Sequence, residues 1–357
     1  MRLRAMSTKQ LVERGIAMGA LMLVAIGPAL FDDYWLGFIL TQTFLIGIAA
    51  ASLIFLSAYG GMVSLAQVAM YGIAGFALGN MVTTEGKGLA LGWNPWLGVV
   101  LAIGLTTLIG LVLGAVASRS AGIYFLMITL TYAVIANYFF GQVTLVSGFS
   151  GISGIDLEAP GFVGADDESP VRLYYVALVV AVLVYLLIRF VLRTPFGVSL
   201  QGVRDEPVRM SSLGYAVPLH RTLAFGFAAF IASLAGVLYV WWNGQIDPAT
   251  IGLQGTIDLL IVAVIGGLGR VEGAWLGAFI FIVINNYVRD SWLTRFLDDV
   301  GIGGSFNTII GVIFLVIVIV SPDGLMGFWG RVSGRLGTRG RGAPPAPEAA
   351  VEGIGRT

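Results

Sequence analysis

Cysteine is absent from this 357-residue sequence, and histidine occurs once, at His220. Without cysteine there are no disulfides and no thiolate metal sites, and a single histidine argues against a histidine-based metal site. Charged residues are scarce as well, at 11%, where soluble globular chains carry about 25%. No basic block suited to nucleic acid is present. The sequence therefore predicts no metal, no cofactor and no nucleic-acid partner.

Apolar residues, in contrast, make up 57% of the chain. A transmembrane helix needs about 20 mostly apolar residues, and such stretches recur throughout. They predict an all-α integral membrane protein, a polytopic bundle of about ten transmembrane helices with a short helical loop on the cytoplasmic side. The two glycine-rich spans, 64–83 and 255–269, leave open whether they cross the membrane fully. The predicted spans are 15–31, 36–58, 64–83, 96–117, 121–141, 172–193, 221–243, 255–269, 273–290 and 305–321.

The distribution of basic residues predicts the orientation, because cytoplasmic loops carry an excess of Lys and Arg. With the N-terminus inside, ten spans return the C-terminus to the same side, and sixteen of the twenty basic residues lie in the cytoplasm. This orientation places the loop 142–171 outside and the loop 194–220 inside. It predicts a cytoplasmic N-terminal arm over 1–14, a transmembrane domain over 15–330 and a disordered cytoplasmic tail over 331–357.

The inside loop has helix signals of its own. Thr194 can cap a helix that has Pro195 at its first position, and Pro207 should break that helix. A second short helix from Val208 would end at Gly214. Two short helices with a charged elbow would present Arg204, Asp205 and Glu206 to a cytoplasmic partner. An ordinary solvated loop is the alternative, and the pattern alone weighs the two equally.

Four stretches of the chain resemble the branched-chain amino acid ABC-transporter permeases of the LivM type. In the inside loop, the Thr-Pro-Phe-Gly start at 194–197, the charged cluster at 204–206 and the Leu-Gly pair at 213–214 are similar to the coupling region of that family. Three further stretches match its glycine-rich motifs, although Ser150 replaces an Asn-like residue in the second: GGMVSLAQ at 60–67, SGFSGISGI at 147–155 and GGLGRVEGA at 266–274. Together these motifs cover roughly residues 36–330.

The resemblance implies the permease subunit of an ATP-driven importer for branched-chain or related small amino acids, in a bacterial cell (inner) membrane. Its implied partners are a second homologous permease, two ATPase subunits and a periplasmic substrate-binding protein. The chain itself would not be an enzyme, since it has no phosphate-binding loop for ATP. The residues implied in ATPase coupling are Gly197, Arg204, Asp205, Glu206 and Gly214.

Other functions stay open. Within the family, the substrate could be urea, a short amide or an aromatic acid. An ion-coupled secondary carrier is a less favoured alternative, because no charged residue lies clearly at the middle of a confident span. A membrane-embedded enzyme would need a clustered acid, base, nucleophile or metal site. The predicted spans contain no such cluster, so no catalytic residue is assigned.

Polar residues within spans are costly and are therefore candidates for the translocation pathway, although amides also hold helices together. Asp258 is expected near an external end. Two glycine pairs near cytoplasmic turns, Gly60 with Gly61 and Gly266 with Gly267, suggest hinges or close helix packing, and interrupted spans in matching positions point at a pathway. The candidate pathway residues are Gln67, Asn80, Asn137, Asp258, Asn285 and Asn286.

Overall fold

The computed structural model describes residues 34–84, 88–155 and 170–289, together with 27, 32, 311, 312, 315, 319 and 324. Within these residues the chain is almost entirely helical, which confirms the predicted all-α membrane fold. The predicted spans 15–31 and 305–321, apart from isolated positions, and the terminal segments 1–14 and 331–357 lie outside the described residues. Among the residues that the structure describes, five helices are long and apolar enough to cross a membrane: Trp35–Gly60, Pro95–Ala117, Ile123–Gln142, Val171–Arg193 and Val217–Asn243.

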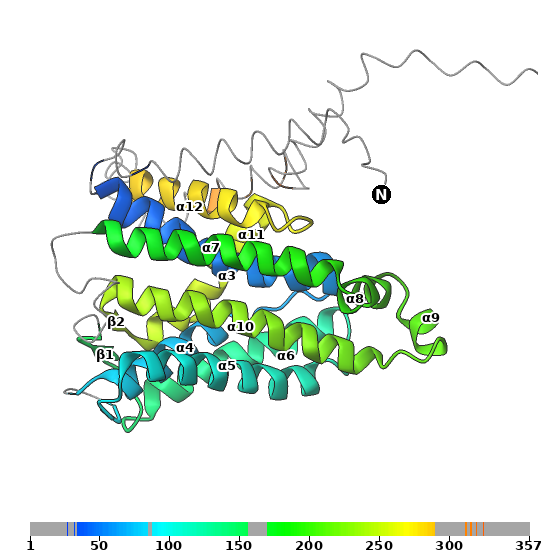
Figure 1. Cartoon of the computed structure of the whole chain (residues 1–357), viewed down its shortest axis with the longest axis horizontal. Coiled ribbons are helices and arrows are strands. Elements are labelled where there is room, and N and C mark those ends of the chain that lie inside the picture. The colour runs from blue at the N-terminus through cyan, green and yellow to red at the C-terminus, as the bar shows by residue number, and fades with distance from the viewer. Residues whose placement is uncertain are drawn as a thin grey trace, which may run out of the picture.

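The long helices form a bundle with two buried helices at its centre (Figure 1). A π-helical turn, η1 (Trp35–Leu40), leads into α3 (Thr41–Gly60), and α10 (Val217–Asn243) packs against α3, α4 and α5. The outer helices are α5 (Pro95–Ala117), α6 (Ile123–Gln142) and α7 (Pro170–Arg193). They expose large apolar side chains such as Leu108, Ile135 and Phe190. Because lipid is the natural solvent for such faces, the outer helices are suited to face the bilayer.

Local sequence sets where several helices begin and end. Asn94 caps α5 by accepting a hydrogen bond from the Trp96 N–H at 3.0 Å, and Pro95 occupies the first helical position. Such a cap satisfies a backbone donor that the helix itself leaves free. At the other end of a helix, Gly61 stops α3 with a φ of +66° and Gly244 stops α10 with a φ of +68°. Glycine adopts this left-handed conformation without steric cost.

The two ends of the bundle differ (Figure 1). At one end lie the short helices α8 (Pro195–Asp205) and α9 (Pro207–Ser212), and we call this the α8 end. At the other lies a small antiparallel ribbon of β1 (Ile152–Ser153) and β2 (Gln245–Ile246), followed by η3 (Pro248–Ile251); we call this the ribbon end. The register pairs Ile152 with Ile246. The α8 and α9 helices confirm the predicted helical character of the loop 194–220.

Besides α8 and α9, the described part holds three apolar helices that are shorter than the five long ones: α4 (Gln67–Val82), α11 (Leu253–Gly266) and α12 (Gly273–Arg289). At 1.5 Å per residue, α4 is about 24 Å long and α11 about 21 Å long. A hydrocarbon core is about 30 Å thick, so neither helix crosses it alone. The predicted spans 64–83 and 255–269 are thus partly non-helical, and the remaining distance is covered by the segments that precede them.

Candidate functional site

The first non-helical segment, 61–66, leads from the end of α3 into α4 and is held by buried polar groups. The Leu65 N–H donates to Thr129 Oγ1 of α6 at 3.1 Å, and Ser52 Oγ of α3 donates to Gln67 Oε1 at 3.1 Å. Gln67 Nε2 in turn donates to Ser64 Oγ at 3.4 Å. Irregular backbone at membrane depth is tolerated where protein groups satisfy it. These contacts explain how a span can be interrupted here.

The position of Gln67 shows how deep α4 begins. Its partner Ser52 lies eight residues before Gly60, the last residue of α3. Eight residues of helix span about 12 Å. The α4 helix therefore starts well inside the bundle, away from the α8 end, and runs to the ribbon end.

The second segment without α-helix, 244–252, contains β2 and the 3-10 turn η3. It enters from the ribbon end and runs back along α4. A Cβ added to Gly75 would lie 2.4 Å from Ile246 Cδ1, and one added to Gly72 would lie 1.8 Å from Ile251 Cγ2. Only glycine at these α4 positions lets the segment approach so closely. From α6, Asn137 Nδ2 donates to the Pro248 carbonyl at 2.6 Å. The segment is thus fixed between α4 and α6 before α11 begins.

The two short helices begin next to each other. A Cβ added to Gly255, in the first turn of α11, would lie 3.6 Å from Val68 Cγ1, in the first turn of α4. From this meeting point α4 runs to the ribbon end and α11 to the α8 end (Figure 1). Interrupted helices that start near the middle of a membrane commonly form the substrate site of a transporter. This junction is the candidate translocation site.

Two of the six predicted pathway residues lie on these two helices near the junction. Gln67 is fully buried in the polar cluster described above. Asp258 accepts a hydrogen bond at Oδ1 from Gln254 Nε2 at 2.9 Å. The sequence predicted Asp258 near an external end, but the structure places it in the second turn of a helix that begins inside the bundle. The difference arises because the preceding segment re-enters before α11 starts.

The asparagines have partners that hold the fold together. Asn80 accepts a hydrogen bond from the Leu89 N–H at 2.8 Å and so fixes the loop after α4. Asn137 holds the re-entrant segment, and Asn286 bonds the Ile282 carbonyl and the Tyr34 hydroxyl. Asn285 is partly buried on α12. For Asn80, Asn137 and Asn286 the structure thus shows the helix-holding contacts that the sequence left as an alternative.

Sequence reasoning missed several residues at the junction. Ser52, Ser64 and Thr129 are fully buried and hold the start of α4. Hydroxyl side chains are common in membrane helices, so no sequence signal singled them out. Gln254 was also missed, although its position four residues before Asp258 on one helix face was a readable signal.

The coupling candidates lie at the α8 end. Thr194 Oγ1 accepts a hydrogen bond from the Gly197 N–H, which confirms the predicted cap. Gly197 itself packs against the backbone of α7, where a Cβ would lie 2.3 Å from the Val191 carbonyl oxygen. Gly214, after α9, has a φ of +90°. The α8 helix contacts α3, α7 and α10, whereas every residue of α9 is at least partly exposed.

Arg204 faces the bundle as well as solvent. Its Nη1 donates to the Ala58 carbonyl in the last turn of α3, and its Nη2 lies 2.7 Å from Asp205 Oδ1. Its side chain also limits the α3 terminus, because a Cβ added to Gly61 would lie 2.6 Å from Arg204 Cγ. Of the three charged elbow residues, Arg204 thus joins α8 to α3, whereas Glu206 is exposed.

The second glycine pair lies in the turn between α11 and α12. A Cβ added to Gly266 would lie 2.1 Å from the Gly273 carbonyl oxygen, and Gly267 has a φ of +105°. Close by, Glu272 pairs with Arg189 of α7 at 3.3 Å and accepts a hydrogen bond from Tyr185. The Gly266–Gly267 pair therefore serves close packing at the α8 end of the bundle.

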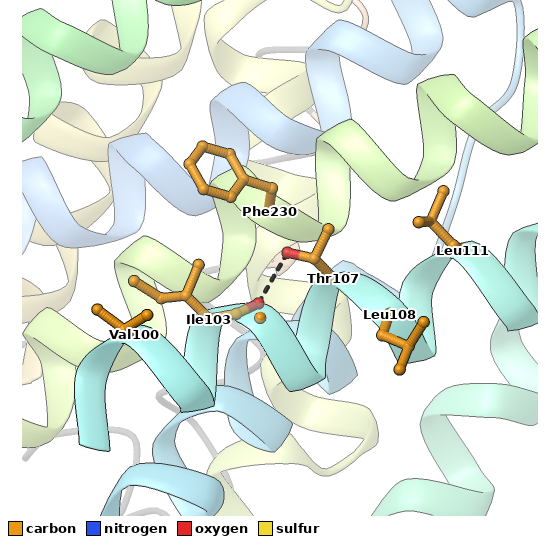
Figure 2. A pocket seen from close by; sticks show the side chains of 7 residues that line it. Val100, Ile103, Thr107, Leu108, Leu111 and Phe230 are labelled. Carbon is orange, nitrogen blue, oxygen red and sulfur yellow. Dashed lines mark hydrogen bonds between the residues drawn. The ribbon is translucent and has the colours of Figure 1, made fainter. Parts of the chain in front are cut away.

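A groove on the outer surface offers no polar site. It lies between α5 and α10 and has a volume of about 530 Å³. Its one polar side chain, Thr107, donates to the Ile103 carbonyl at 2.7 Å, as Figure 2 shows. Since no polar group is left to orient a solute, the groove suits apolar chains. The lining residues are Val100, Ile103, Gly104, Thr107, Leu108, Leu111 and Phe230.

The fold and the junction define a class: a multi-pass, all-helical membrane transport protein with two interrupted spans. The family follows from sequence comparison. Residues 35–321 match the family of permease components of branched-chain amino acid transport systems, and the chain belongs to this family. It is therefore a permease subunit of an ABC transporter, as the four motifs predicted.

Curated relatives carry two kinds of substrate in their names. The chain is 26% identical over 299 residues to the probable branched-chain amino acid transport permease protein LivM of Methanocaldococcus jannaschii, covering 78% of this chain and 84% of that protein. It is 30% identical over 118 residues to LivM of Escherichia coli, covering 33% and 28%. It is also 24% identical over 331 residues to the ribose import permease protein RbsC of Haemophilus influenzae, covering 89% and 94%. No solved structure matches the chain.

Proposed function

We propose that this chain is a membrane-spanning subunit of an ATP-driven importer of branched-chain or related small amino acids. The observation that carries the proposal is the pair of interrupted spans, α4 and α11, in a bundle whose α8 end bears a short helix that packs against three longer ones. Interrupted spans of this kind form a substrate site near the middle of the membrane. The short helix α8 can pass a movement from outside the membrane to the longer helices on which it packs. The LivM relatives support the amino-acid assignment.

In this proposal the α8 end faces the cytoplasm, in agreement with the excess of basic residues there. Two ATPase subunits bind below it, and the exposed α9 with Glu206 forms the contact surface. Val208 and Leu213 are 79% and 66% exposed and supply apolar contact area. Charged groups at the rim of such a contact fix partner choice and register more than they add affinity.

Arg204 then has a transmitting role. A movement of α8 reaches the end of α3 through the hydrogen bond to the Ala58 carbonyl. The next residues along the chain are the Gly60–Gly61 pair and the segment 61–66, which leads to the start of α4. The contact of Arg204 with Gly61 adds a second connection to the same hinge. An ATP-driven movement below the membrane would thus displace one of the two helix starts at the junction.

The remaining partners follow from the same proposal. A second homologous permease completes the pathway, and a periplasmic binding protein delivers substrate at the ribbon end, in a bacterial inner membrane. The test is gentle co-purification of the tagged chain from native membranes, followed by mass spectrometry. We expect two ATPases, a second permease and a binding protein. Recovery of the chain alone, with uptake driven by an ion gradient, would contradict the proposal.

A sugar importer is the second candidate. It is favoured by the similarity to RbsC over 89% of this chain, and by a 26% identity over 265 residues to the fructose import permease protein FrcC of Rhizobium meliloti. The ligand that leaves the co-purified binding protein on denaturation separates the two candidates. An amino acid supports the first candidate, and a ribose- or fructose-like sugar supports the second.

A further inference from the structure

The α11 helix carries a charged residue at a depth where charge is costly. Asp258 lies eight residues before Gly266, where α11 ends at the α8 end. Eight residues of helix span about 12 Å, and half of a hydrocarbon core is about 15 Å. The Asp258 carboxylate is therefore near the middle of the membrane. Ionisable residues at this depth mark a substrate or ion pathway unless they have a partner within the bundle.

Among the residues that the structure describes, no Lys or Arg pairs with Asp258. The salt bridges among the described residues join Arg189 to Glu272 and Arg204 to Asp205. No Lys or Arg occurs between Arg221 and Arg270, and none occurs within the predicted spans 15–31 and 305–321. The basic residues of the described helices lie near helix ends. Neither the described residues nor the two predicted spans outside them thus supply a counter-charge for an ionised Asp258, and a cationic substrate group can take that place.

The surface around Asp258 has a polar and an apolar stripe. Gln254 and Asp258 form the polar stripe, in which Gln254 Nε2 donates to Asp258 Oδ1 at 2.9 Å. This hydrogen bond leaves Gln254 Oε1 and Asp258 Oδ2 as acceptors. Leu253 and Ile257 form the apolar one, one residue before each polar residue, and are 59% and 42% exposed. We call these four residues the α11 subsite.

The start of α11 adds backbone donors to this surface. The N–H groups of Leu253, Gln254 and Gly255 have no hydrogen-bond acceptor among the residues that the structure describes, whereas the Thr256 N–H bonds the Gly252 carbonyl. The first turn of a helix leaves such donors free. Apolar surface, two acceptors and a row of free donors therefore lie within two turns of one helix, near the middle of the membrane.

We propose that the α11 subsite holds an α-amino acid in transit. The substrate ammonium binds Asp258 and Gln254 Oε1, since an ammonium carries three donors and the missing positive charge. Its branched apolar side chain packs on Leu253 and Ile257. Its carboxylate accepts hydrogen bonds from the free N–H groups at the start of α11, where the helix dipole favours an anion. A sugar would leave the carboxylate without a counter-charge.

The inference rests on the proposed function and deepens it. Its test uses the complete complex, co-purified from native membranes and reconstituted in proteoliposomes with ATP inside and the binding protein outside. Uptake of radiolabelled leucine and the ATPase activity stimulated by leucine-loaded binding protein are both measured. The variants are Asp258→Asn, which removes the charge at constant size, and Asp258→Glu, which restores it. Asp32→Asn, an exposed carboxylate beside η1, is the matched control.

We expect Asp258→Asn to lower leucine uptake roughly tenfold to a hundredfold, the range for losing one hydrogen bond to a charged group. The stimulated ATPase should stay within about twofold of wild type, since Asp258 lies in the membrane and not at the ATPase contact. Asp258→Glu should recover part of the uptake, and Asp32→Asn should match wild type. Leu253→Ala should lower uptake of leucine more than that of alanine.

Three results would overturn the subsite. In the first, Asp258→Asn imports leucine as wild type does. In the second, this variant loses the second permease on purification, which would assign Asp258 to a subunit contact. In the third, wild type imports leucine in response to a proton gradient without ATP. If the wild-type complex imports ribose with ATP but no leucine, the amino-acid function itself fails, and that outcome is visible before any variant is compared.

Discussion

Removing the connection between α8 and α3 should separate ATP hydrolysis from transport. Arg204→Met keeps the length of the side chain but removes its donors to the Ala58 carbonyl and to Asp205. The Asp205 side chain is 61% exposed, so the ion pair adds almost nothing. The hydrogen bond from a guanidinium to a helix-terminal carbonyl is worth about 1.5 kcal/mol after allowance for the partly exposed Arg204. That energy corresponds to roughly a tenfold change in an equilibrium constant.

The assay is the number of substrate molecules imported per ATP hydrolysed by the reconstituted complex. For Arg204→Met we expect this ratio to fall about tenfold while ATP hydrolysis continues. Arg119→Met is the control, because Arg119 is an exposed arginine in the turn between α5 and α6, at the same end of the bundle. An unchanged ratio in Arg204→Met would refute the transmitting role. So would an equal fall in the control, because a general effect of lost charge at this end would then explain both.

Three further predictions concern the interrupted spans. Gly61→Ala forces a left-handed φ on a residue with a Cβ and pushes against Arg204, so it should destabilise the hinge by about 1–2 kcal/mol and lower import per ATP, measured as above. Gly72→Ala should prevent folding, because its Cβ would lie 1.8 Å from Ile251 Cγ2, and the peak of folded protein on size-exclusion chromatography should disappear. Adding Ile251→Ala to the same chain should restore that peak. A peak that does not return would contradict the packing. Gln67→Leu removes the two hydrogen bonds to Ser52 and Ser64, which keep only their local bonds to the Ala49 carbonyl and the Ala66 N–H. It should cost about 1–3 kcal/mol for the two bonds, seen as a lower thermal midpoint, which an unchanged midpoint would disprove.

Much of the fold could be predicted from the sequence because the bilayer imposes one simple requirement. Long apolar runs gave the five long helices to within a few residues, and Thr194, Pro195 and Pro207 predicted the helices of the inside loop. In each case the signal is local: either a run of apolar residues or a cap next to the helix it begins. Composition and capping chemistry therefore predict which segments are helical.

The depth at which helices start could not be predicted, because distant contacts determine it. The α4 helix begins at Gln67 because Ser52 of α3 binds Gln67 itself and Thr129 of α6 binds Leu65 in the preceding segment. Asp258 was placed near an external end because the chain between α10 and α11 gives no sign of returning along α4. The glycine-rich character of 64–83 and 255–269 raised the question of interrupted spans, but only the contacts of Gly72 and Gly75 answer it.

The direction in which the charged residues at the α8 end point could not be predicted. The cluster at 204–206 was predicted as a surface for a cytoplasmic partner. Glu206 is exposed in that way, whereas Arg204 points to the Ala58 carbonyl. A charged residue on a short amphipathic helix can face either side, and the sequence does not say which. The structure resolves this because α8 packs on α3.

We propose above all that this permease subunit works in an ATP-driven importer of amino acids. The most direct measurement is uptake of radiolabelled leucine, isoleucine and valine by proteoliposomes that contain the natively purified complex, with and without ATP inside. We expect accumulation that requires both ATP and the binding protein and that is insensitive to collapse of proton and sodium gradients. Accumulation that persists without ATP and disappears with the gradients would contradict it.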